Sequence, residues 1–260
     1  MSKDEKAILE VKGLKVGIES TSILKGIDLR IPQGEIHAIM GRNGSGKTTT
    51  ANVIMGHPAY EIEEGEILLN GESLLEMEPW ERSRAGVFLS FQYPQSIPGL
   101  QVGNFLRKSV SSVRGEDAAR GSGFRESLSE AMEELDIPKS FLSRYVNDGF
   151  SGGEKKRFEI LQLMLLQPKL AVLDETDSGL DIDGIRTVAK GINSVVRGTE
   201  NGALIITHYS RILEHVNPDR VHIMIGGKIV ASGGPSLANL LEDNGYDWLE
   251  DQIAEGVVFE

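Results

Sequence analysis

Hydrophobic and polar residues alternate along three short segments near the N-terminus, and each segment is rich in Ile, Leu or Val. Alternation of this kind is typical of a strand that buries one face. We therefore predict an antiparallel sheet in this part of the chain. The segments are ILEVKGLKV (8–16), ILKGIDLRI (23–31) and EGEILLNGE (64–72), and the last contains an Asn-Gly turn.

Further along the chain, apolar strand-like segments are separated by stretches with helical spacing. Strands that alternate with helices favour parallel pairing in a sheet that is covered on both faces. We predict a largely parallel sheet of this kind, in an α/β fold that closes with a hairpin at 221–232. The predicted strands are 35–40, 86–91, 170–175 and 203–208, and the predicted helices are 48–55, 152–167 and 182–196.

The pattern changes at about residues 93–150. Prolines and a polar, glycine-containing stretch come first, and FRESLSEAMEELDIP (124–138) follows, with its apolar residues at helical spacing. We interpret this part as a mostly helical lobe inserted in the α/β core. No linker or internal repeat divides the chain, so we predict a single domain over residues 1–260.

Composition and charge narrow the class of protein. The net charge is −12, which argues against a nucleic-acid partner because such a partner needs a basic face. No apolar stretch approaches the roughly 18 residues that span a bilayer, and the charged N-terminus lacks the apolar segment of a signal peptide. The chain has no cysteine, which excludes disulfides and thiolate metal sites. We expect a cytoplasmic protein with no direct membrane insertion.

The strongest motif is G-x-x-x-x-G-K-T, which lies between the predicted strand 35–40 and the predicted helix 48–55. Glycines in this turn let backbone N–H groups and the helix N-terminus surround phosphate groups. Lys47 adds a positive charge beside them, and the hydroxyl of Thr48 is placed to bind Mg²⁺. The predicted nucleotide-binding loop consists of Gly41, Arg42, Asn43, Gly44, Ser45, Gly46, Lys47, Thr48 and Thr49.

Two acidic residues, Asp174 and Glu175, end the predicted strand 170–175. On its own, such a pair is most often a solvated strand end. In an α/β chain with a phosphate-binding loop it predicts a second nucleotide motif. Asp174 is then placed to hold Mg²⁺ through water, and Glu175 to orient or deprotonate the attacking water.

A Ser-Gly-Gly-Glu motif opens the predicted helix 152–167, and its members are Ser151, Gly152, Gly153 and Glu154. A serine hydroxyl and glycine amides at a helix N-terminus form a second phosphate-binding end. An isolated serine at this position is more often an ordinary N-cap. The motif lies 23 residues before Asp174, and this proximity favours the phosphate-binding interpretation.

Taken in order, these motifs resemble the motif set of the ATP-binding-cassette (ABC) ATPase family. The set also includes Gln92 at the end of a strand, a Ser-Gly-Leu-Asp turn at 178–181 and His208 at the end of the strand 203–208. The resemblance implies a P-loop NTPase core of the RecA-like type, with an N-terminal antiparallel β subdomain and an inserted helical subdomain. It also implies a Mg²⁺-dependent ATPase with ATP and Mg²⁺ as its cofactors.

The resemblance assigns a role to each motif. ATP-dependent homodimerisation forms two composite sites, and the P-loop of one subunit is completed by Ser151, Gly152, Gly153 and Glu154 of the other. His208 contacts the γ-phosphate. The implied catalytic residues are Glu175, His208 and Lys47, and the implied metal ligands are Thr48, Gln92 and Asp174.

Two positions depart from the family pattern. Family members often stack the adenine on an aromatic residue after the first strand, where this chain has Ile18. The sequence therefore leaves the choice between adenine and guanine open. The Ser-Gly-Gly-Glu motif corresponds to the signature motif of the family, and it has Glu154 where glutamine is more usual, which adds negative charge close to the phosphates.

Longer segments are more particular than these motifs. They are FQYPQSIPG (91–99), FSGGEKKRFEIL (150–161), DETDSGLDIDG (174–184), THYSRIL (207–213) and GYDWLE (245–250). These segments resemble the SufC family, the ATPases of the SUF iron–sulfur cluster assembly system. The resemblance implies a soluble complex with SufB- and SufD-like scaffold proteins. One alternative is the ATPase subunit of a membrane transporter, and another is a non-catalytic regulator, which the intact motifs disfavour.

Two hypotheses concern the resting subunit and its partner surface. Lys156 either pairs with Glu175 and holds it away from the nucleotide, or belongs to a solvated basic patch. Tyr93, Ile97 and Leu100 either form an exposed set on which a partner docks, or pack the helical lobe.

Overall fold

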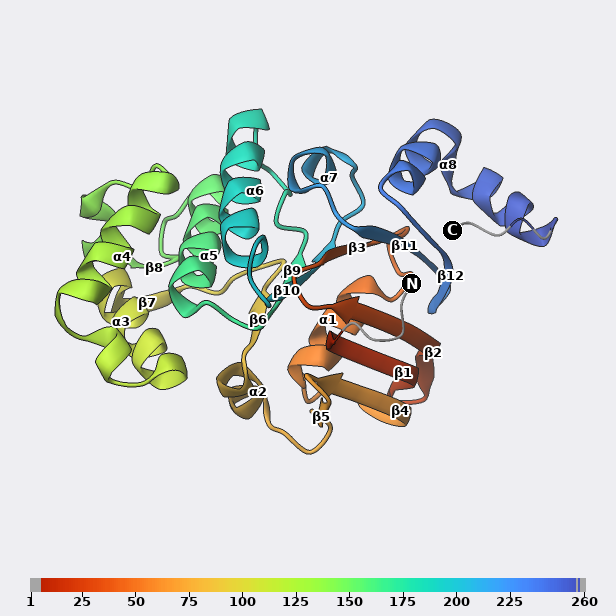
Figure 1. Cartoon of the computed structure of the whole chain (residues 1–260), viewed down its shortest axis with the longest axis horizontal. Coiled ribbons are helices and arrows are strands. Elements are labelled where there is room, and N and C mark those ends of the chain that lie inside the picture. The colour runs from red at the N-terminus through yellow and green to blue at the C-terminus, as the bar shows by residue number, and fades with distance from the viewer. Residues whose placement is uncertain (1–5, 256, 258–260) are drawn as a thin grey trace.

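The computed structural model describes residues 6–255 and residue 257. The remaining positions of the predicted domain, 1–5, 256 and 258–260, lie outside the described residues. The described part of the chain forms a six-stranded, a four-stranded and a two-stranded sheet, with helices packed around them (Figure 1).

The six-stranded sheet lies at the centre of the fold. Its strands are β3 (Ile36–Met40), β6 (Val87–Ser90), β9 (Leu170–Asp174), β10 (Gly202–Ile206), β11 (Arg220–Ile225) and β12 (Lys228–Gly233). The strand order is β12-β11-β3-β10-β9-β6, with every pair parallel except the β11–β12 hairpin. The prediction of a largely parallel sheet with a closing hairpin is therefore confirmed.

Side chains of β9 alternate between two hydrophobic cores on opposite faces of this sheet. Ala171 and Leu173 pack into the larger core, which includes most of the helices. Leu170 and Val172 pack into the second core, which the N-terminal strands share. A strand buried on both faces has no polar side, and this explains why β9 appears in the sequence as a continuous apolar run.

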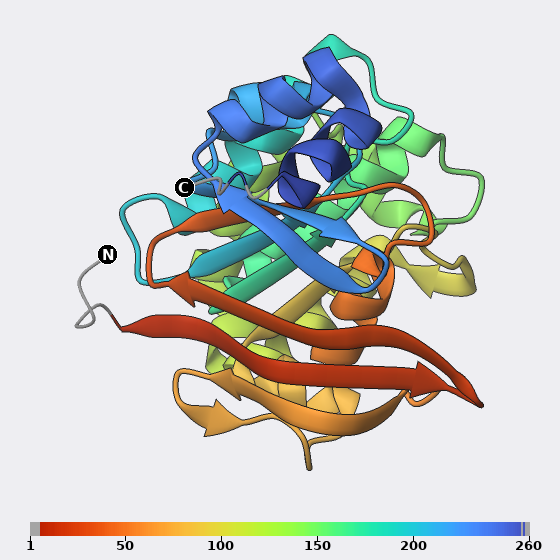
Figure 2. The same ribbon diagram turned by 90° about the vertical axis from the view of Figure 1, so that its right-hand side faces the viewer.

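The second core lies between the central sheet and an antiparallel sheet. The strands of the antiparallel sheet are β1 (Ala7–Ile18), β2 (Thr21–Pro32), β4 (Glu61–Leu69) and β5 (Glu72–Ser73), in the order β2-β1-β4-β5. Helix α1 (Lys47–Met55) contacts β2 on one side and β9 and β10 on the other. Figure 2 shows this sheet beneath the central one. The predicted N-terminal antiparallel sheet is therefore confirmed.

Helices α5 and α6 have the spans that the sequence predicted to within a residue. They run over Gly152–Leu166 and Ile182–Val196, and they pack against each other in the larger core. Three other helices were not predicted: α2 (Pro79–Ala85), α7 (Arg211–Val216) and α8 (Ser236–Ala254). The first two are too short to show periodicity, and α8 is interrupted by the non-helical backbone of Gly245.

The part of the chain predicted as a helical lobe contains more structure than the pattern indicated. Its elements are β7 (Ile97–Gln101), α3 (Val102–Arg114), η1 (Asp117–Ala119), α4 (Gly121–Glu134), η2 (Lys139–Ser143) and β8 (Tyr145–Val146). Helix α3 buries Val102, Leu106 and Val110 along one stripe. The pairing of β7 with β8 is between segments far apart in the sequence, so no local pattern signals it.

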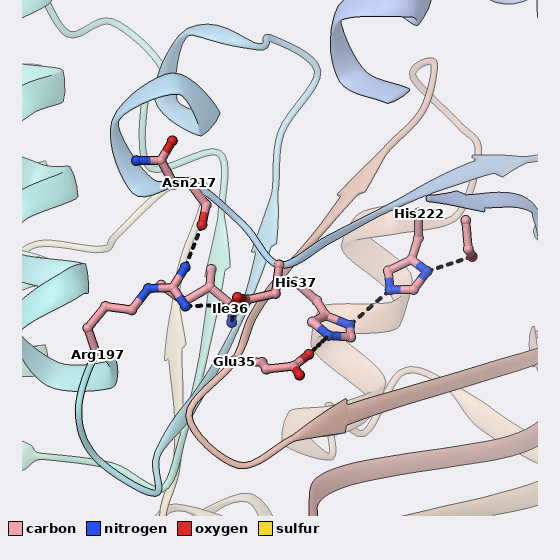
Figure 3. A network of polar contacts seen from close by, with 8 residues as sticks. Glu35, Ile36, His37, Arg197, Asn217 and His222 are labelled. Carbon is pink, nitrogen blue, oxygen red and sulfur yellow. Dashed lines mark hydrogen bonds and ion pairs between the residues drawn. The ribbon is translucent and has the colours of Figure 1, made fainter. Parts of the chain in front are cut away.

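A chain of four polar side chains joins the start of β3 to the β11–β12 hairpin (Figure 3). His37 Nε2 lies 2.8 Å from Glu35 Oε2, His37 Nδ1 lies 3.0 Å from His222 Nε2, and His222 Nδ1 lies 2.7 Å from Ser232 Oγ. Both imidazoles are buried. One arrangement of protons satisfies every contact with both rings neutral: each Nε2–H donates, and each Nδ1 accepts.

We expect this pair to make the fold sensitive to acid. Burial lowers the pKa of His222 to about 3 and also lowers the pKa of His37. The unfolded chain therefore binds protons near pH 6.5 that the native state excludes, and the free energy of unfolding falls as the pH drops below that value. Each histidine contributes at most about 1.4 kcal/mol per pH unit to this decrease in the free energy of unfolding.

Urea denaturation at about pH 7.5 and about pH 5.5 measures this loss. The His222→Gln variant should show a smaller loss than the wild type, because glutamine retains a donor and an acceptor without titrating. The matched control is His57→Gln, since His57 is exposed. Equal losses in the wild type and in His222→Gln would contradict the assignment.

Candidate functional site

The P-loop connects β3 to α1, and Gly46 and Gly41 show why the loop requires glycine. Gly46 has a φ of 108°, and a Cβ atom there would lie 2.8 Å from Leu24 Cδ2. A Cβ atom on Gly41 would lie 2.4 Å from the carbonyl oxygen of Met224 and 2.5 Å from Ser45 Oγ. Gly46 supplies a conformation that other residues avoid, and Gly41 permits a close approach of backbones.

The loop lines a cavity of about 430 Å³. Lys47 is buried, and its Nζ donates to the carbonyl oxygens of Gly41 (2.7 Å) and Arg42 (2.9 Å). The pKa of Lys47 is lowered overall, because the effect of burial outweighs that of the nearby acids Glu175 and Asp174, which raise it. The cavity is lined by Ile23, Asn43, Gly44, Gly46, Lys47, Thr48, Thr49, Gln92 and Glu175. The structure therefore gathers the P-loop, Gln92 and Glu175 around one space.

Asp174 ends β9 and has a buried carboxylate oxygen, Oδ1, without a hydrogen-bond partner among the described residues. The pKa of Asp174 is raised to about 6. Burial is the main cause, and a hydrogen bond with the Thr48 side chain partly offsets it. An unpartnered carboxylate oxygen, a hydroxyl and the amide oxygen of Gln92 are the hard donors that Mg²⁺ prefers. The residues present fit Mg²⁺, and Thr48, Gln92 and Asp174 are the candidates to hold it.

Glu175 is fixed by its backbone and by two other predicted site residues. Its φ is 49°, and its N–H donates to the carbonyl oxygen of Ile206 at 2.8 Å. Gln92 Nε2 donates to Glu175 Oε2 at 2.7 Å, and His208 Nδ1 lies 3.3 Å from Glu175 Oε1. Gln92 and His208 each lie two residues beyond a strand end, not at the end itself, and they meet at Glu175.

The Ser-Gly-Gly-Glu motif forms the N-terminus of α5. Ser151 Oγ accepts a hydrogen bond from the Glu154 N–H at 3.2 Å, and Glu154 Oε2 accepts one from the Ser151 N–H at 2.8 Å. This reciprocal pair is a capping box, so Ser151 is the N-cap of α5, and its role at the phosphates of another subunit stays a prediction. The motif does not line the cavity of its own P-loop, and Ser151 and Gly152 are exposed.

The negative charge of Glu154 has a partner that the sequence analysis missed. Arg144 Nη1 donates to Glu154 Oε1, and this contact is the main cause that lowers the pKa of Glu154. The guanidinium carbon of Arg144 also lies 4.4 Å from the centre of the Phe150 ring, within range of a cation–π interaction. The expected excess of negative charge at the motif is therefore compensated from η2–β8, a part of the chain without local signal.

Known proteins are similar to the part of the chain that carries these motifs. The family model described as ABC transporter matches residues 24–178, which include the P-loop, the Ser-Gly-Gly-Glu motif and the strand-end acids. The chain belongs to the ABC transporter ATPase family. This ABC ATPase is 52% identical over 254 residues to the probable ATP-dependent transporter ycf16 of Cyanophora paradoxa, over 96% of this chain and 98% of that protein. It is 50% identical to vegetative protein 296 of Bacillus subtilis, over 94% of each chain.

Solved structures agree with the fold of this ABC ATPase. An ATP-binding subunit of an ABC transporter has a TM-score of 0.76 and 27% identity, over 91% of this chain and 92% of that chain. A dimeric ATP-binding cassette bound to ADP and phosphate has a TM-score of 0.74 and 20% identity, over 87% of this chain and 98% of that chain. The predicted fold class is confirmed, and the activity of the family is ATP hydrolysis. Across residues 6–255 and 257, no helix is both long enough and apolar enough to span a membrane.

The hypothesis that Lys156 of this ABC ATPase pairs with Glu175 is wrong in this structure. Lys156 is buried on α5, and its Nζ contacts Glu159 Oε2 at 3.2 Å and the carbonyl oxygen of Phe91 at 3.1 Å. The alternative of a solvated patch is also wrong for this residue. The reason is the orientation of α5, which turns Lys156 toward the end of β6, while Gln92 is the residue that holds Glu175.

A second contact missed by the sequence analysis joins the two loops that carry Glu175 and His208. The Thr207 hydroxyl lies 3.0 and 3.2 Å from the two carboxylate oxygens of Asp177, and both residues are buried. Burial raises the pKa of Asp177, and the hydrogen bond from Thr207 lowers it. The position of Thr207 directly before His208 is a signal that could have pointed to this contact. The hydrogen bond between Thr207 and Asp177 connects the turn after β9 to the turn after β10.

Ile18 and Ile23 differ in their position relative to the cavity that the P-loop lines. Ile18, at the position where relatives often have an aromatic residue, ends β1 and does not line the cavity. Ile23 on β2 lines it instead. The aliphatic side chain in the wall of this cavity is therefore that of Ile23.

An apolar groove of about 330 Å³ lies beside Gln92, between the end of β6 and the helices of residues 97–166. Tyr93 and Ile97 line it and are 77% and 42% exposed, as the docking interpretation predicts. Leu100 does not fit that interpretation, because it is half-buried and packs against the larger core. Phe91, which the sequence analysis left out, lines the groove and is 52% exposed.

Proposed function

We propose that this ABC ATPase is the ATP-hydrolysing subunit of a cytoplasmic SUF-type iron–sulfur cluster assembly complex, in which ATP-dependent dimerisation rearranges SufB- and SufD-like scaffold proteins. The observation that carries the proposal is that the groove beside Gln92 is built in part from a segment similar to the SufC family: the residue that contacts Glu175 leads directly into this exposed apolar surface. The segments similar to the SufC family support it, and one of them, 91–99, forms part of the groove. The chain has no cysteine, so the ligands of an assembled cluster would lie on the partners.

In the proposed reaction the chain's own residues divide three tasks. Lys47 leaves its loop carbonyls for the β- and γ-phosphate oxygens, which are stronger acceptors. Glu175 takes a proton from the attacking water, and His208 donates to the γ-phosphate. When Mg²⁺ is bound by Thr48, Gln92 and Asp174, it neutralises phosphate charge. Ser151, Gly152, Gly153 and Glu154 act on the nucleotide of the partner subunit.

In the proposed complex, the groove offers a route by which the state of the nucleotide reaches a scaffold protein. Gln92 begins the segment that carries Tyr93 and Ile97, so a displacement of Gln92 moves one wall of the groove. Pro94 also lines the groove, and its fixed φ limits how much of this movement the backbone absorbs. A helix with an apolar face is the partner chemistry that fits such a groove.

The second candidate is the ATPase subunit of a membrane transporter. Relatives with about 50% identity are named probable ATP-dependent transporters, among them the proteins of Cyanophora paradoxa and Synechocystis. The same groove would then receive a segment of a membrane-spanning chain. The two proposals differ in the partner, not in the chemistry of the site.

Capture of the partner separates them. We expect tagged wild-type protein to retain an iron-containing scaffold protein from the soluble fraction of its native cells, and the Tyr93→Asp/Ile97→Asp variant to lose it. Basal ATP hydrolysis should stay within about twofold of wild type, because neither side chain touches the nucleotide cavity. Immunoblotting, iron analysis and an ATPase assay provide the three measurements.

The matched control is Trp80→Asp, which charges another exposed aromatic residue, 56% exposed, on α2 outside the groove. It should retain the partner. Capture of an integral membrane protein by the wild type would overturn the SUF assignment and favour the transporter. Retention of the scaffold by the double variant would show that the groove is not the docking surface.

A further inference from the structure

A buried ion pair on α5 holds the backbone of the residue before Gln92. Lys156 and Glu159 are 5% and 3% exposed, and their charged atoms lie 3.2 Å apart. Glu159 Oε1 accepts the Phe91 N–H at 2.9 Å, and Lys156 Nζ donates to the Phe91 carbonyl oxygen at 3.1 Å. The pair thus binds both polar backbone groups of Phe91, a residue that is 52% exposed overall.

Burial of the charges of Lys156 and Glu159 costs free energy, so the presence of the pair at this position needs an explanation. An ion pair removed from water gains little net stability, and apolar residues of similar size often replace it without loss. Burial indeed raises the pKa of Glu159, while Lys156 lowers it. Apolar residues would pack this position equally well, but they would leave the Phe91 N–H and C=O without these partners. Holding that peptide residue is therefore the specific property of the pair.

The pair also connects two parts of the catalytic machinery. It lies on the same helix as Ser151 and Glu154, within the first three turns of α5. On the other side, Phe91 is followed at once by Gln92, whose side chain donates to Glu175 at 2.7 Å. Two charge-assisted hydrogen bonds therefore connect α5, the helix that begins at the Ser-Gly-Gly-Glu motif, to the residue before Gln92.

We propose that Lys156 and Glu159 are positioning residues for Gln92, and that they link the signature motif of a subunit to the metal-binding residue of its own nucleotide site. In a dimer with composite sites, the signature motif contacts the nucleotide of the opposite subunit. The pair then couples the nucleotide of the opposite subunit to the metal-binding residues of its own subunit. The inference rests on the proposed place of Gln92 at the metal.

The test uses the Lys156→Met/Glu159→Gln variant, which removes both charges together and leaves no unpaired buried charge. Without nucleotide, hydrogen–deuterium exchange of the peptide that contains Phe91 and Gln92 should be faster than in the wild type. With ATP, the Mg²⁺ concentration for half-maximal turnover should rise about tenfold, as for other residues that orient a metal ligand. Binding of ATP without Mg²⁺ should stay within about twofold.

The matched control is Lys155→Met, the same substitution one residue earlier on α5, where the side chain is half-buried and lies outside the pair. It should leave exchange and Mg²⁺ dependence unchanged. If the Lys156→Met/Glu159→Gln variant does not fold, the Lys156→Gln/Glu159→Gln variant carries the test, because it also removes both charges together and keeps a polar side chain at both positions. Its effects should be smaller but in the same direction.

A double-mutant cycle with Gln92→Ala separates positioning from general weakening. Gln92→Ala alone tests the role of Gln92 at the metal, and its Mg²⁺ dependence should rise. If the pair acts through Gln92, adding Lys156→Met/Glu159→Gln to Gln92→Ala should cause no further rise. Additive effects, or a folded double variant with wild-type exchange and Mg²⁺ dependence, would overturn the proposal.

Discussion

The Glu175→Gln variant is expected to bind ATP as the wild type does and to lose at least about a hundredfold in turnover, the lower range for removal of a general base. The carboxylate lies in the nucleotide cavity, 2.7 Å from Gln92 Nε2 and 3.3 Å from His208 Nδ1. Glutamine keeps the shape and an oxygen that accepts from Gln92, but it cannot take a proton from water. The predicted loss therefore falls on the chemical step and not on binding.

Single-turnover hydrolysis of labelled ATP measures the chemical step, and calorimetric titration measures binding. Asp183→Asn is the matched control, because it makes the same change of acid to amide at an exposed side chain on α6. That variant should hydrolyse ATP at the wild-type rate. Turnover by Glu175→Gln within a few-fold of wild type would show that another group activates the water.

Mixing two inactive variants is expected to restore activity, and this is the second large effect. In a composite site, Glu175 of one subunit works with Gly153 of the other. A dimer of one Glu175→Gln and one Gly153→Asp subunit therefore contains one intact site and one doubly defective site. Because a two-fold interface pairs the same residues twice, an equal mixture should recover up to about a quarter of wild-type turnover.

The Gly153→Asp substitution is suited to this experiment because the position has room within the subunit. A Cβ atom there would lie 3.7 Å from Leu180 Cδ2, an ordinary contact. The aspartate should fold normally and repel the phosphates of the opposite nucleotide. Each variant alone provides the baseline, and light scattering with Mg·ATP reports dimer formation. A mixture as inactive as its components, in a population that scattering shows to be dimeric, would contradict the composite site.

Several features of this protein were accessible from its sequence because short-range chemistry determines them. The Gly-rich turn needs glycine where φ is positive or backbones approach closely, and Gly46 and Gly41 meet these two conditions. Buried parallel strands must be apolar along their whole length, so β9 and the acids at its end were recognisable. The capping box of Ser151 and Glu154 is equally local, since its two members are three residues apart.

What the sequence could not determine depends on which side chains meet after the helices have packed. Lys156 lies within reach of different acids depending on the rotation of α5, and packing directs it to Glu159 and Phe91. The same holds for Arg144 at Glu154, a contact between η2–β8 and α5. Periodicity specifies that a face is buried but not what it touches. The tertiary structure alone therefore decided how the signature helix is connected to Gln92.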